Sequence, residues 1–295
     1  MKKALITGVA GFIGSNLADA LLEQRFDVYG IDNFKTGKEE NIKEALANGL
    51  KFVNNDINYI KGNPLGRRSS RFDVVYHLAA LPRVQYSIDE PIETNRVNIS
   101  GTLSMLVWAK KLARKLVYAS SSSAEACKSP YALQKRVGED YCRMWNNLFG
   151  LNNISLRFFN VYGKRMNIDG EYACLIPRHL RLAKENMNLP IYGDGTNRRD
   201  FTYVSDVVNC LISVGINETV RGGVYNVGTG TNYAVNDVSN LIKKLTKSKS
   251  DTVYKRARKG EPKITKADIS KTTKDFGWKP LVDLEQGIRT CKDLI

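Results

Sequence analysis

A glycine-rich turn near the start of the chain limits the possible folds most strongly. Before it, KALITGV has the apolar, partly β-branched composition of a buried strand, and after it FIGSNLADALLEQ has apolar residues at helical spacing. Between the two, Gly8, Gly11 and Gly14 form the pattern GxxGxxG. Glycines at this spacing permit a tight turn and let a pyrophosphate approach the backbone at the helix N-terminus. The segment therefore predicts a dinucleotide-binding βα unit.

An acidic residue follows where such a unit needs one. Asp32 ends the next β-branched run, at roughly the 20-residue spacing of a carboxylate that binds the adenine ribose hydroxyls. Because a carboxylate repels a 2′-phosphate, Asp32 predicts NAD rather than NADP as the cofactor. Lys35 and Lys38 lie close by in sequence and weaken that preference.

Strand-like and helix-like segments alternate through the first half of the chain. The further strand-like runs are DVYGID, KFVNND, FDVVYHLAA, KLVYASSS and NISLRFFNVYG. This alternation predicts an α/β fold with a Rossmann-type, doubly wound parallel sheet and helices on both faces. Beyond residue 163 the segments are rich in turns. We expect residues 1–163 to form the cofactor domain and residues 164–295 a smaller α/β substrate domain, with 199–229 partly returning to the first.

Composition excludes several classes of protein. The 295 residues are 42% hydrophobic and 25% charged, as in an ordinary globular protein. No apolar run approaches the roughly 18 residues of a membrane helix. The five cysteines are scattered, and with only two histidines they favour neither a disulfide framework nor a metal site. We therefore expect a cytoplasmic protein that binds no metal and no membrane.

The net charge of +15 is unusual for such a protein. Much of it comes from the clusters KKLARK, KKLTKSK and KRARK. A basic surface attracts polyanions, so it suits nucleic acid and equally a small substrate that carries phosphates. Since most of these lysines are explained as solvated helix faces, nucleic-acid binding is not expected.

The stretch SSSSAEACKSPYALQK, residues 120–135, contains the parts of a proton-transfer site. Tyr131 and Lys135 are four residues apart at the start of a predicted helix, so they share one face. An ammonium group beside a phenol favours the phenolate, which predicts that Lys135 lowers the pKa of Tyr131 from about 10. Ser121 ends the preceding strand and is placed to hydrogen-bond a substrate oxygen. These three residues predict proton transfer coupled to oxidation at a nicotinamide.

With these motifs, the chain resembles the extended short-chain dehydrogenase/reductases, specifically nucleotide-sugar epimerases of the UDP-galactose or UDP-N-acetylglucosamine 4-epimerase type. The resemblance covers nearly the whole chain. Its motifs follow the family order: TGVAGFIG, DNFKTG, HLAALPRVQYS, VNISGT, SPYALQK, RFFNVYG, IYGDGTNRRDF, YNVGTG, RKGEP and DFGWKP.

The resemblance implies an NAD-dependent enzyme acting on a UDP-sugar, with residues 164–295 as the nucleotide-sugar-binding domain. It also implies a homodimer formed through the helices at about 91–113 and 131–149. The residues implied at the cofactor are Gly8, Gly11, Phe12, Ile13, Gly14, Asp32, Asn33, Asp56, Ile57, Ala79, Ala80, Asn98, Tyr131 and Lys135. Those implied at the substrate are Ser121, Ser122, Asn160, Tyr192, Arg199, Arg258, Glu261 and Thr265.

Several of these residues receive specific roles from the resemblance. Asn160 is expected to contact the substrate diphosphate, and Arg199 and Arg258 to clamp it, since planar guanidinium groups bind phosphate oxygens in pairs. Glu261 is expected at the uridine ribose, where the family usually has Asp. Thr265 matches the position beside the sugar C2 group, and its small size implies that an N-acetyl group fits.

The resemblance therefore implies a 4-epimerase of UDP-GlcNAc and UDP-GalNAc, and also of UDP-Glc and UDP-Gal, through a transient 4-keto sugar. Related 4,6-dehydratases and UDP-glucuronate decarboxylases carry acidic residues just after the catalytic serine, where this chain has Ser122 and Ser123. A UDP-glucuronate epimerase or decarboxylase stays an alternative. If the strand ended two residues later, Glu125 would take the decarboxylase position.

One departure from the family pattern concerns the segment between Ser121 and Tyr131, which is shorter than usual. Reach is no obstacle, because ten residues span up to about 33 Å. The missing segment normally covers the substrate, so its loss exposes the sugar to water. A protein of another class, a non-catalytic NAD- or RNA-binding Rossmann protein with a trimmed loop, therefore remains a second hypothesis.

Overall fold

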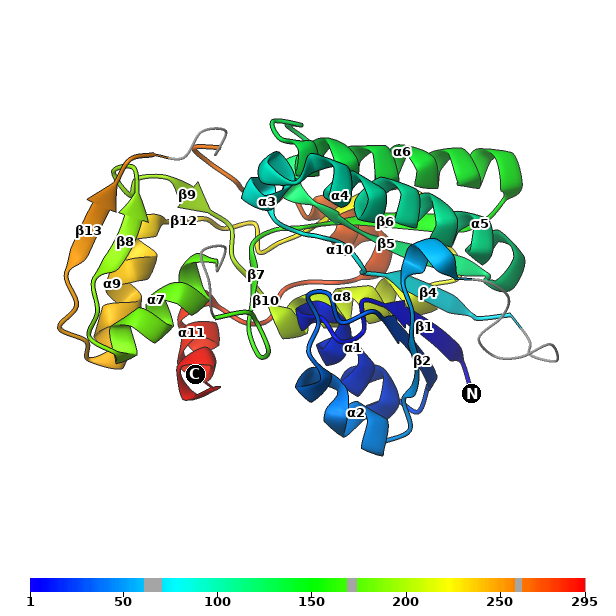
Figure 1. The fold of residues 1–295 in the computed structure, drawn as a ribbon, viewed down its shortest axis with the longest axis horizontal. Coiled ribbons are helices and arrows are strands. Elements are labelled where there is room, and N and C mark those ends of the chain that lie inside the picture. The colour runs from blue at the N-terminus through cyan, green and yellow to red at the C-terminus, as the bar shows by residue number, and fades with distance from the viewer. Residues whose placement is uncertain (61–70, 169–173, 258–261, 295) are drawn as a thin grey trace.

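The central feature of the computed structural model is a seven-stranded, entirely parallel sheet (Figure 1). The structure describes residues 1–60, 71–168, 174–257 and 262–294. The strand order is β11-β6-β5-β4-β1-β2-β3. In that order the strands are Val224–Val227, Asn152–Phe158, Lys115–Ser121, Val74–His77, Lys3–Thr7, Asp27–Asp32 and Lys51–Asn54. Because the chain runs outward from β1 in both directions, the sheet is doubly wound, as predicted.

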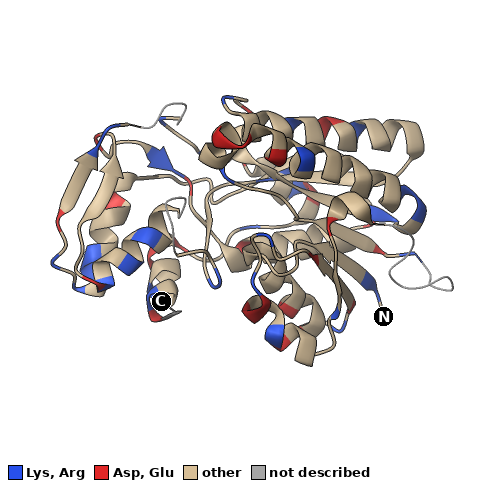
Figure 2. Ribbon diagram, in the orientation of Figure 1, with Lys and Arg blue, Asp and Glu red and all other residues tan. Residues whose placement is uncertain are grey.

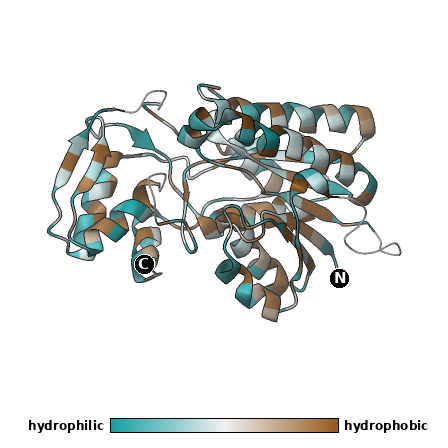
Figure 3. Ribbon diagram, in the orientation of Figure 1, coloured by the Kyte–Doolittle hydropathy of each residue, from teal (hydrophilic) through white to brown (hydrophobic). Residues whose placement is uncertain are grey.

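Helices cover both faces of this sheet (Figure 1). One face carries α1 (Phe12–Glu23), α2 (Lys43–Ala47) and α8 (Val204–Ile216). The other carries α3 (Val84–Asp89), α4 (Pro91–Asn95), a π-helical turn (Arg96–Gly101), α5 (Thr102–Leu112) and α6 (Pro130–Phe149). A separate hydrophobic core fills each layer. The strands of the sheet are correspondingly apolar, which is typical of parallel strands that are buried on both sides (Figure 3).

A second lobe lies beside the sheet (Figure 1). It is built around a parallel strand pair, β8 and β13, that packs on two helices, α7 and α9, with α11 next to them. Two short strand pairs, β7 with β10 and β9 with β12, lie in the segments where the chain crosses from one lobe to the other (Figure 1). Bounds are β7 Val161–Tyr162, α7 Leu175–Lys184, β8 Leu189–Tyr192, β9 Arg198–Arg199, β10 Thr202–Tyr203, β12 Tyr233–Ala234, α9 Val235–Thr246, β13 Thr252–Lys255, α10 Ser270–Phe276 and α11 Leu284–Leu294.

Charges are spread widely over the molecule. Lys and Arg lie on both lobes and alternate with acidic side chains (Figure 2). Within the part of the chain that the structure describes, no helix is both long enough and apolar enough to cross a membrane.

The glycine turn between β1 and α1 is as close-packed as the sequence predicts. Gly8 has a φ of +73°, and a Cβ there would lie 2.8 Å from the Ala79 Cα. A Cβ on Gly14 would lie 2.1 Å from the Gly8 carbonyl oxygen. Side chains at these positions would push α1 away from the strand end, so only glycine fits.

Replacing Gly8 by alanine tests this packing. We expect Gly8→Ala to lower the free energy of unfolding by about 2 kcal/mol or more, because left-handed strain adds to a backbone clash. Gly277 is the matched control: its φ is +66°, and a Cβ there meets nothing within 4 Å. Gly277→Ala should cost only the strain, about 1 kcal/mol. Equal losses in urea unfolding would contradict the close approach at Gly8.

Candidate active site

The glycine turn lies at the point where the strand order of the sheet reverses. Its neighbour across this point is the loop after β4, where the Ala79 backbone N–H donates to the Thr7 hydroxyl over 3.3 Å. In open parallel sheets, ligands bind in the crevice at such a switch point. Gly11 is the N-cap of α1, and no described side chain caps that helix end. The α1 backbone N–H groups are thus available to a pyrophosphate, and this end of the sheet fits a dinucleotide.

Phe12 and Ile13 begin α1 and are partly buried against the core. Both residues, which were predicted for the cofactor site, therefore lie directly after the glycine turn.

Asp32 lies at the end of β2 and is nearly buried. Its carboxylate accepts hydrogen bonds from the backbone N–H groups of Ala10 (2.9 Å) and Phe34 (2.8 Å). Burial raises the pKa of Asp32 above its ordinary value, although these two N–H groups act to lower it. Lys35, the cation nearest in sequence, forms an ion pair with Glu93. Because Glu93 offsets that charge, the preference for NAD over a 2′-phosphorylated cofactor is stronger than the sequence alone indicates.

Asp56 and Ile57 lie at the next strand end, beside Asn33. The Asp56 side chain caps a short helical turn by accepting from the Asn58 N–H (2.9 Å) and forms a 3.3 Å ion pair with Arg96. Burial raises the pKa of Asp56, but hydrogen bonds from Asn58 and the charge of Arg96 outweigh it and lower the pKa. Asn33 donates to Asp56 over 3.4 Å.

Asn98 is buried in the π-helical turn, and both polar atoms of its side-chain amide are hydrogen-bonded to other residues. Its Oδ1 accepts from the Leu81 N–H (2.8 Å), and its Nδ2 donates to the Gln134 Oε1 (2.8 Å). It therefore joins the loop of Ala79 and Ala80 to helix α6. These contacts fix the loop after β4, and the expectation that Asn98 lines the cofactor stays a prediction.

The three predicted catalytic residues converge despite the short segment between them. β5 ends at Ser121, and α6 begins at Pro130 with the Ser129 hydroxyl capping the Ala132 N–H (3.2 Å). The Ser121 hydroxyl hydrogen-bonds the Ser123 hydroxyl (2.8 Å), and its proximity to the phenol of Tyr131 acts to lower the pKa of that phenol. The Lys135 Nζ donates to the Ala119 carbonyl (2.7 Å) and lies 6.0 Å from the Tyr131 ring centroid. The trimmed loop thus still brings these groups together.

Burial dominates the electrostatics of this group. It raises the pKa of Tyr131 to about 12, against the hydrogen bond from Ser121 and the charge of Arg83, which lower it. Burial also lowers the pKa of Lys135 to about 7, although Glu139 opposes the shift. The prediction that Lys135 brings the pKa of Tyr131 below 10 is therefore wrong for this structure: desolvation of the phenol outweighs every nearby charge.

A buried ion pair supports the catalytic helix from behind, and the sequence reasoning missed it. Glu139, on α6, accepts from the Ser120 hydroxyl (2.5 Å) and from the Arg157 Nε (2.8 Å) and Nη2 (2.9 Å). These contacts join α6 to β5 and β6. The signal that points to Glu139 is its position four residues after Lys135, which places both side chains on one helix face.

The end of β5 decides where Glu125 lies. Because β5 ends at Ser121 and Ser122–Ala124 form a short helical turn, the later strand end that would have put Glu125 at the decarboxylase position is not formed. The Glu125 carboxylate is mostly exposed and lies 4.0 Å from the Arg157 guanidinium.

Three of the predicted substrate residues, Asn160, Arg199 and Thr265, lie close together around Asp200. Asn160 follows β6, has a φ of +32°, and donates to the Asp200 carbonyl (2.6 Å). Its Nδ2 also lies 3.5 Å from the Thr265 hydroxyl. Arg199 lies in β9, and its Nη1 donates to the Arg198 carbonyl (3.0 Å). Asn160 and Thr265 are therefore direct neighbours, although they are far apart in sequence.

Asp200 holds this region together, and the sequence analysis did not single it out. Its fully buried carboxylate accepts from the backbone N–H groups of Thr229 (2.8 Å), Gly230 (3.0 Å) and Ala267 (3.0 Å), and from the Thr229 hydroxyl. Two segments that are distant in sequence, at 229–230 and at 267, are thus fixed around the residue that follows Arg199. In the sequence, the only sign of this role is that Asp200 is the acidic residue of the NRRDF motif.

The remaining predicted residues are placed as follows. Tyr192 ends β8, and its phenol accepts from the Arg178 Nη1 over 3.5 Å. Arg258 and Glu261 lie outside the described residues. Among the residues that the structure describes, no group of three or more His, Cys, Asp or Glu side chains is arranged to hold a metal ion.

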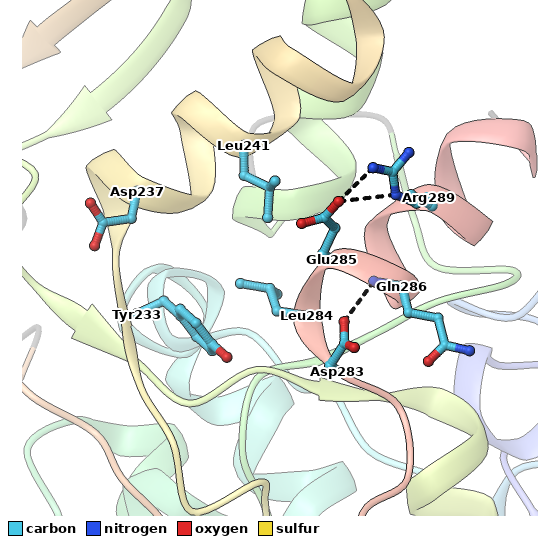
Figure 4. Close-up of a pocket in the computed structure, with 8 residues that line it drawn as sticks. All are labelled: Tyr233, Asp237, Leu241, Asp283, Leu284, Glu285, Gln286 and Arg289. Carbon is cyan, nitrogen blue, oxygen red and sulfur yellow. Dashed lines mark hydrogen bonds and ion pairs between the residues drawn. The ribbon is translucent and has the colours of Figure 1, made fainter.

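A surface hollow of about 550 Å³ lies between α9 and α11 (Figure 4). Tyr233 and Leu284 line it, and the Glu285–Arg289 ion pair borders it. It contains none of the residues predicted for cofactor or substrate, so the candidate active site is the crevice at the strand ends.

Comparisons with known proteins identify the family of this chain. Residues 4–228 match the family described as the NAD dependent epimerase/dehydratase family. This chain belongs to that family, an enzyme family whose cofactor is NAD.

Its relatives share the fold but differ in activity. A putative UDP-glucose 4-epimerase of Methanocaldococcus jannaschii is 35% identical and is matched over 97% of this chain and 95% of its own length. A UDP-N-acetyl-alpha-D-glucosaminuronate decarboxylase of Bacillus cytotoxicus is 33% identical over 98% and 96%. The solved UDP-N-acetylglucosamine 4-epimerase of Methanobrevibacter ruminantium, in complex with UDP-N-acetylmuramic acid, superposes with a TM-score of 0.92 at 32% identity, over 99% of this chain and 97% of that one.

The ion pair behind the catalytic helix gives a first prediction for this site. We expect Glu139→Gln to lower the free energy of unfolding by about 3 kcal/mol, because it leaves Arg157 as an uncompensated, largely buried charge. Glu185→Gln breaks the exposed pair of Glu185 with Arg181 and should cost about 0.5 kcal/mol or less. Urea unfolding of both variants measures the difference, and similar losses would contradict a supporting role for Glu139.

The buried lysine gives a second prediction. Since the pKa of Lys135 is about 7 in the folded protein and 10.5 in its ordinary state, the unfolded chain binds a proton between these values that the folded one does not. The contribution of Lys135 to the free energy of unfolding should therefore rise as the pH increases from 7 to 9.5. We expect the unfolding free energy of wild type to rise relative to Lys135→Met over this interval. A difference that stays constant or falls would show that Lys135 is charged in the folded state.

Proposed function

We propose that this protein is a 4-epimerase of UDP-sugars that acts on UDP-GlcNAc and UDP-GalNAc and also on UDP-Glc and UDP-Gal. The observation that carries the proposal is the convergence of Ser121, at the end of β5, and Tyr131, at the start of α6, near the glycine turn. It places a proton donor and acceptor beside the crevice that fits the cofactor. The residues proposed to hold NAD are those of the glycine turn, with Asp32 and Asp56.

NAD, when bound, supplies the reversible oxidation of the sugar carbon. Tyr131 takes the proton of the C4 hydroxyl, and Ser121 donates a hydrogen bond to the same oxygen as it becomes the carbonyl of a 4-keto sugar. Tyr131 returns the proton when the ketone is reduced on its other face. Lys135 holds the start of α6 to β5 through the Ala119 carbonyl. The buried setting excludes water from these steps.

The proposed substrate preference depends on Thr265. Its hydroxyl accepts from the Asp200 N–H (3.4 Å) and lies beside the Asn160 amide. Asn160 is proposed to contact the diphosphate, together with Arg199 and Arg258, and a small side chain next to it leaves room for an N-acetyl group. A relative described as a UDP-N-acetylglucosamine 4-epimerase supports this assignment.

A UDP-uronate decarboxylase or epimerase is the second candidate. It is favoured by the relatives, which include a UDP-N-acetyl-alpha-D-glucosaminuronate decarboxylase and a solved UDP-glucuronic acid 4-epimerase. Against it, Ser122 and Ser123 occupy the places where acidic residues would perform the additional acid–base step. The convergence of Ser121 and Tyr131 weighs against the non-catalytic NAD- or RNA-binding alternative, since such a protein has no use for it.

We also propose that the protein forms a homodimer through α5 and α6. Apolar side chains project from this layer into solvent: Ile92, Val107, Leu133, Met144, Leu148 and Phe149 are each at least 43% exposed. An apolar face of this extent on parallel-packed helices supports burial against a second copy.

The enzyme assay tests the proposed function directly. We expect the purified protein to convert UDP-GlcNAc to a mixture with UDP-GalNAc, measured by chromatography, and Tyr131→Phe to reduce kcat by about 10²–10⁴-fold because it removes the acid–base group. Tyr131→Phe should bind UDP-GlcNAc as wild type does. Release of CO₂ from UDP-glucuronate, with no change in UDP-GlcNAc, would replace the epimerase with the second candidate.

Thr265 gives an independent test of substrate choice. Thr265→Tyr should lower kcat/KM for UDP-GlcNAc by about 100-fold or more and leave UDP-Glc within a few-fold, since a bulky ring excludes the N-acetyl group. Thr265→Ser is the control and should turn over both sugars. Equal effects of the tyrosine on both sugars would refute the gate.

A further inference from the structure

A chain of buried hydrogen bonds runs behind the crevice, from the glycine turn to the catalytic helix. Its centre is His77, a buried residue at the end of β4 that has a hydrogen-bond partner at each ring nitrogen. The His77 Nδ1 lies 2.8 Å from the hydroxyl of Thr7, the residue before Gly8, and the Nε2 lies 3.1 Å from the hydroxyl of Thr102. The ring therefore joins the end of β1 to the start of α5.

The partners of the two hydroxyls decide which ring nitrogen carries the proton. A hydroxyl has one proton, and Thr102 donates it to the Asn98 carbonyl (2.8 Å), so Thr102 accepts from His77. The Nε2 of His77 is then the protonated nitrogen, and the Nδ1 of the neutral ring accepts from Thr7. The Thr7 oxygen in turn accepts from the Ala79 N–H (3.3 Å). Every donor in the chain thus points from Ala79 toward Asn98.

The surroundings of His77 keep its ring neutral. Burial, with a smaller contribution from the positive charge of Lys135 on α6, lowers the pKa of His77 to about 3. From β5, Tyr118 stacks on the imidazole, with the ring centroids 5.8 Å apart. A neutral imidazole has one donor and one acceptor, which are the two functions that Thr102 and Thr7 require. The contacts of the ring therefore match its protonation state.

The far end of the chain of hydrogen bonds reaches the helix of Tyr131. The Asn98 side chain accepts from the Leu81 N–H (2.8 Å) and donates to the Leu81 carbonyl (3.2 Å), so it holds the loop after β4. It also donates to the Gln134 Oε1 (2.8 Å), and Gln134 lies on α6 between Tyr131 and Lys135. The glycine turn, the loop after β4 and α6 are thus joined by continuous polar contacts.

We propose that His77 is a positioning residue for the cofactor, whose Nε2-protonated ring holds the glycine turn and the loop after β4 at the separation that NAD requires. These two segments leave no slack, because a Cβ on Gly8 would lie 2.8 Å from the Ala79 Cα. A shift of either one displaces the pyrophosphate-binding turn relative to α6. This role concerns NAD, the cofactor of the family, and it does not depend on which UDP-sugar the enzyme converts.

The first test reads the tautomer by NMR. The chain has two histidines, so the ring resonances of protein labelled with ¹⁵N-histidine are assigned by their loss in His77→Gln or, by elimination, in His179→Gln. We expect the His77 Nδ1 to have the chemical shift of an unprotonated nitrogen and the Nε2 that of a protonated one, both unchanged from pH 8 to pH 5. A ring protonated on Nδ1, or one that titrates in this interval, would overturn the proposal.

The second test measures cofactor binding in variants of Thr102, the acceptor of the ring proton. We expect Thr102→Val to raise the Kd for NAD about tenfold or more, measured by calorimetry on the full chain, because a buried N–H loses its partner. Thr102→Ser keeps the hydroxyl and should bind NAD nearly as wild type does.

Thr272 provides the matched control. Its hydroxyl is also buried and donates to a backbone carbonyl, that of Asn226 in β11 (2.7 Å), at the edge of the sheet. Thr272→Val should lower the free energy of unfolding about as much as Thr102→Val and leave the Kd for NAD unchanged. An unchanged Kd in Thr102→Val, or an equal rise in Thr272→Val, would assign the chain to stability alone and overturn the proposal. If wild type converts no UDP-sugar, the proposed function fails, while the Kd for NAD still decides the role of His77.

Discussion

The buried carboxylate of Glu139 is the interaction on which the site depends. It accepts one hydrogen bond from β5, through Ser120, and two from β6, through Arg157, while it belongs to α6. A helix packed on a sheet by apolar contacts alone can slide by a residue with little cost, whereas three directional bonds to one buried anion fix its register. The start of α6 then has one position relative to the end of β5, and Tyr131 meets Ser121 in spite of the short connection.

A second buried carboxylate does the same for the other half of the crevice. Asp200 draws backbone N–H groups of two distant segments to one point, and Arg199, Asn160 and Thr265 lie around it. The two lobes are therefore joined by polar contacts that have specific geometry. Such contacts suit a crevice that has to keep phosphate-binding and proton-transferring groups in a fixed relation.

Within the crevice, burial and charge oppose each other. Desolvation raises the pKa of the Tyr131 phenol and lowers that of the Lys135 ammonium, so a dry site disfavours the charged form of both groups while it strengthens every electrostatic contact. The same dryness that protects a ketone from water therefore opposes ionisation of the phenol.

Much of the fold was determined by the sequence alone, because its signals are local. The glycines at 8, 11 and 14 lie between a strand and a helix, and their spacing predicts a dinucleotide-binding turn without any distant contact. Alternating strand and helix patterns likewise predict a doubly wound parallel sheet, and the structure has one. Asp32, Ser121, Tyr131 and Lys135 were found by their places at strand ends and helix starts, and the structure puts each at such a place.

Only the tertiary structure decided how these groups are surrounded. Glu139 and Asp200 were missed because a buried carboxylate is defined by its donors, which come from segments that are distant in sequence. The pKa of Tyr131 was predicted in the wrong direction because spacing along a helix reveals neighbours but not desolvation. The contact of Arg83 with Cys174 joins residues of two lobes, and no local pattern encodes it. Periodicity and turn chemistry are written in short stretches of chain, whereas burial and charge balance exist only after distant segments have packed.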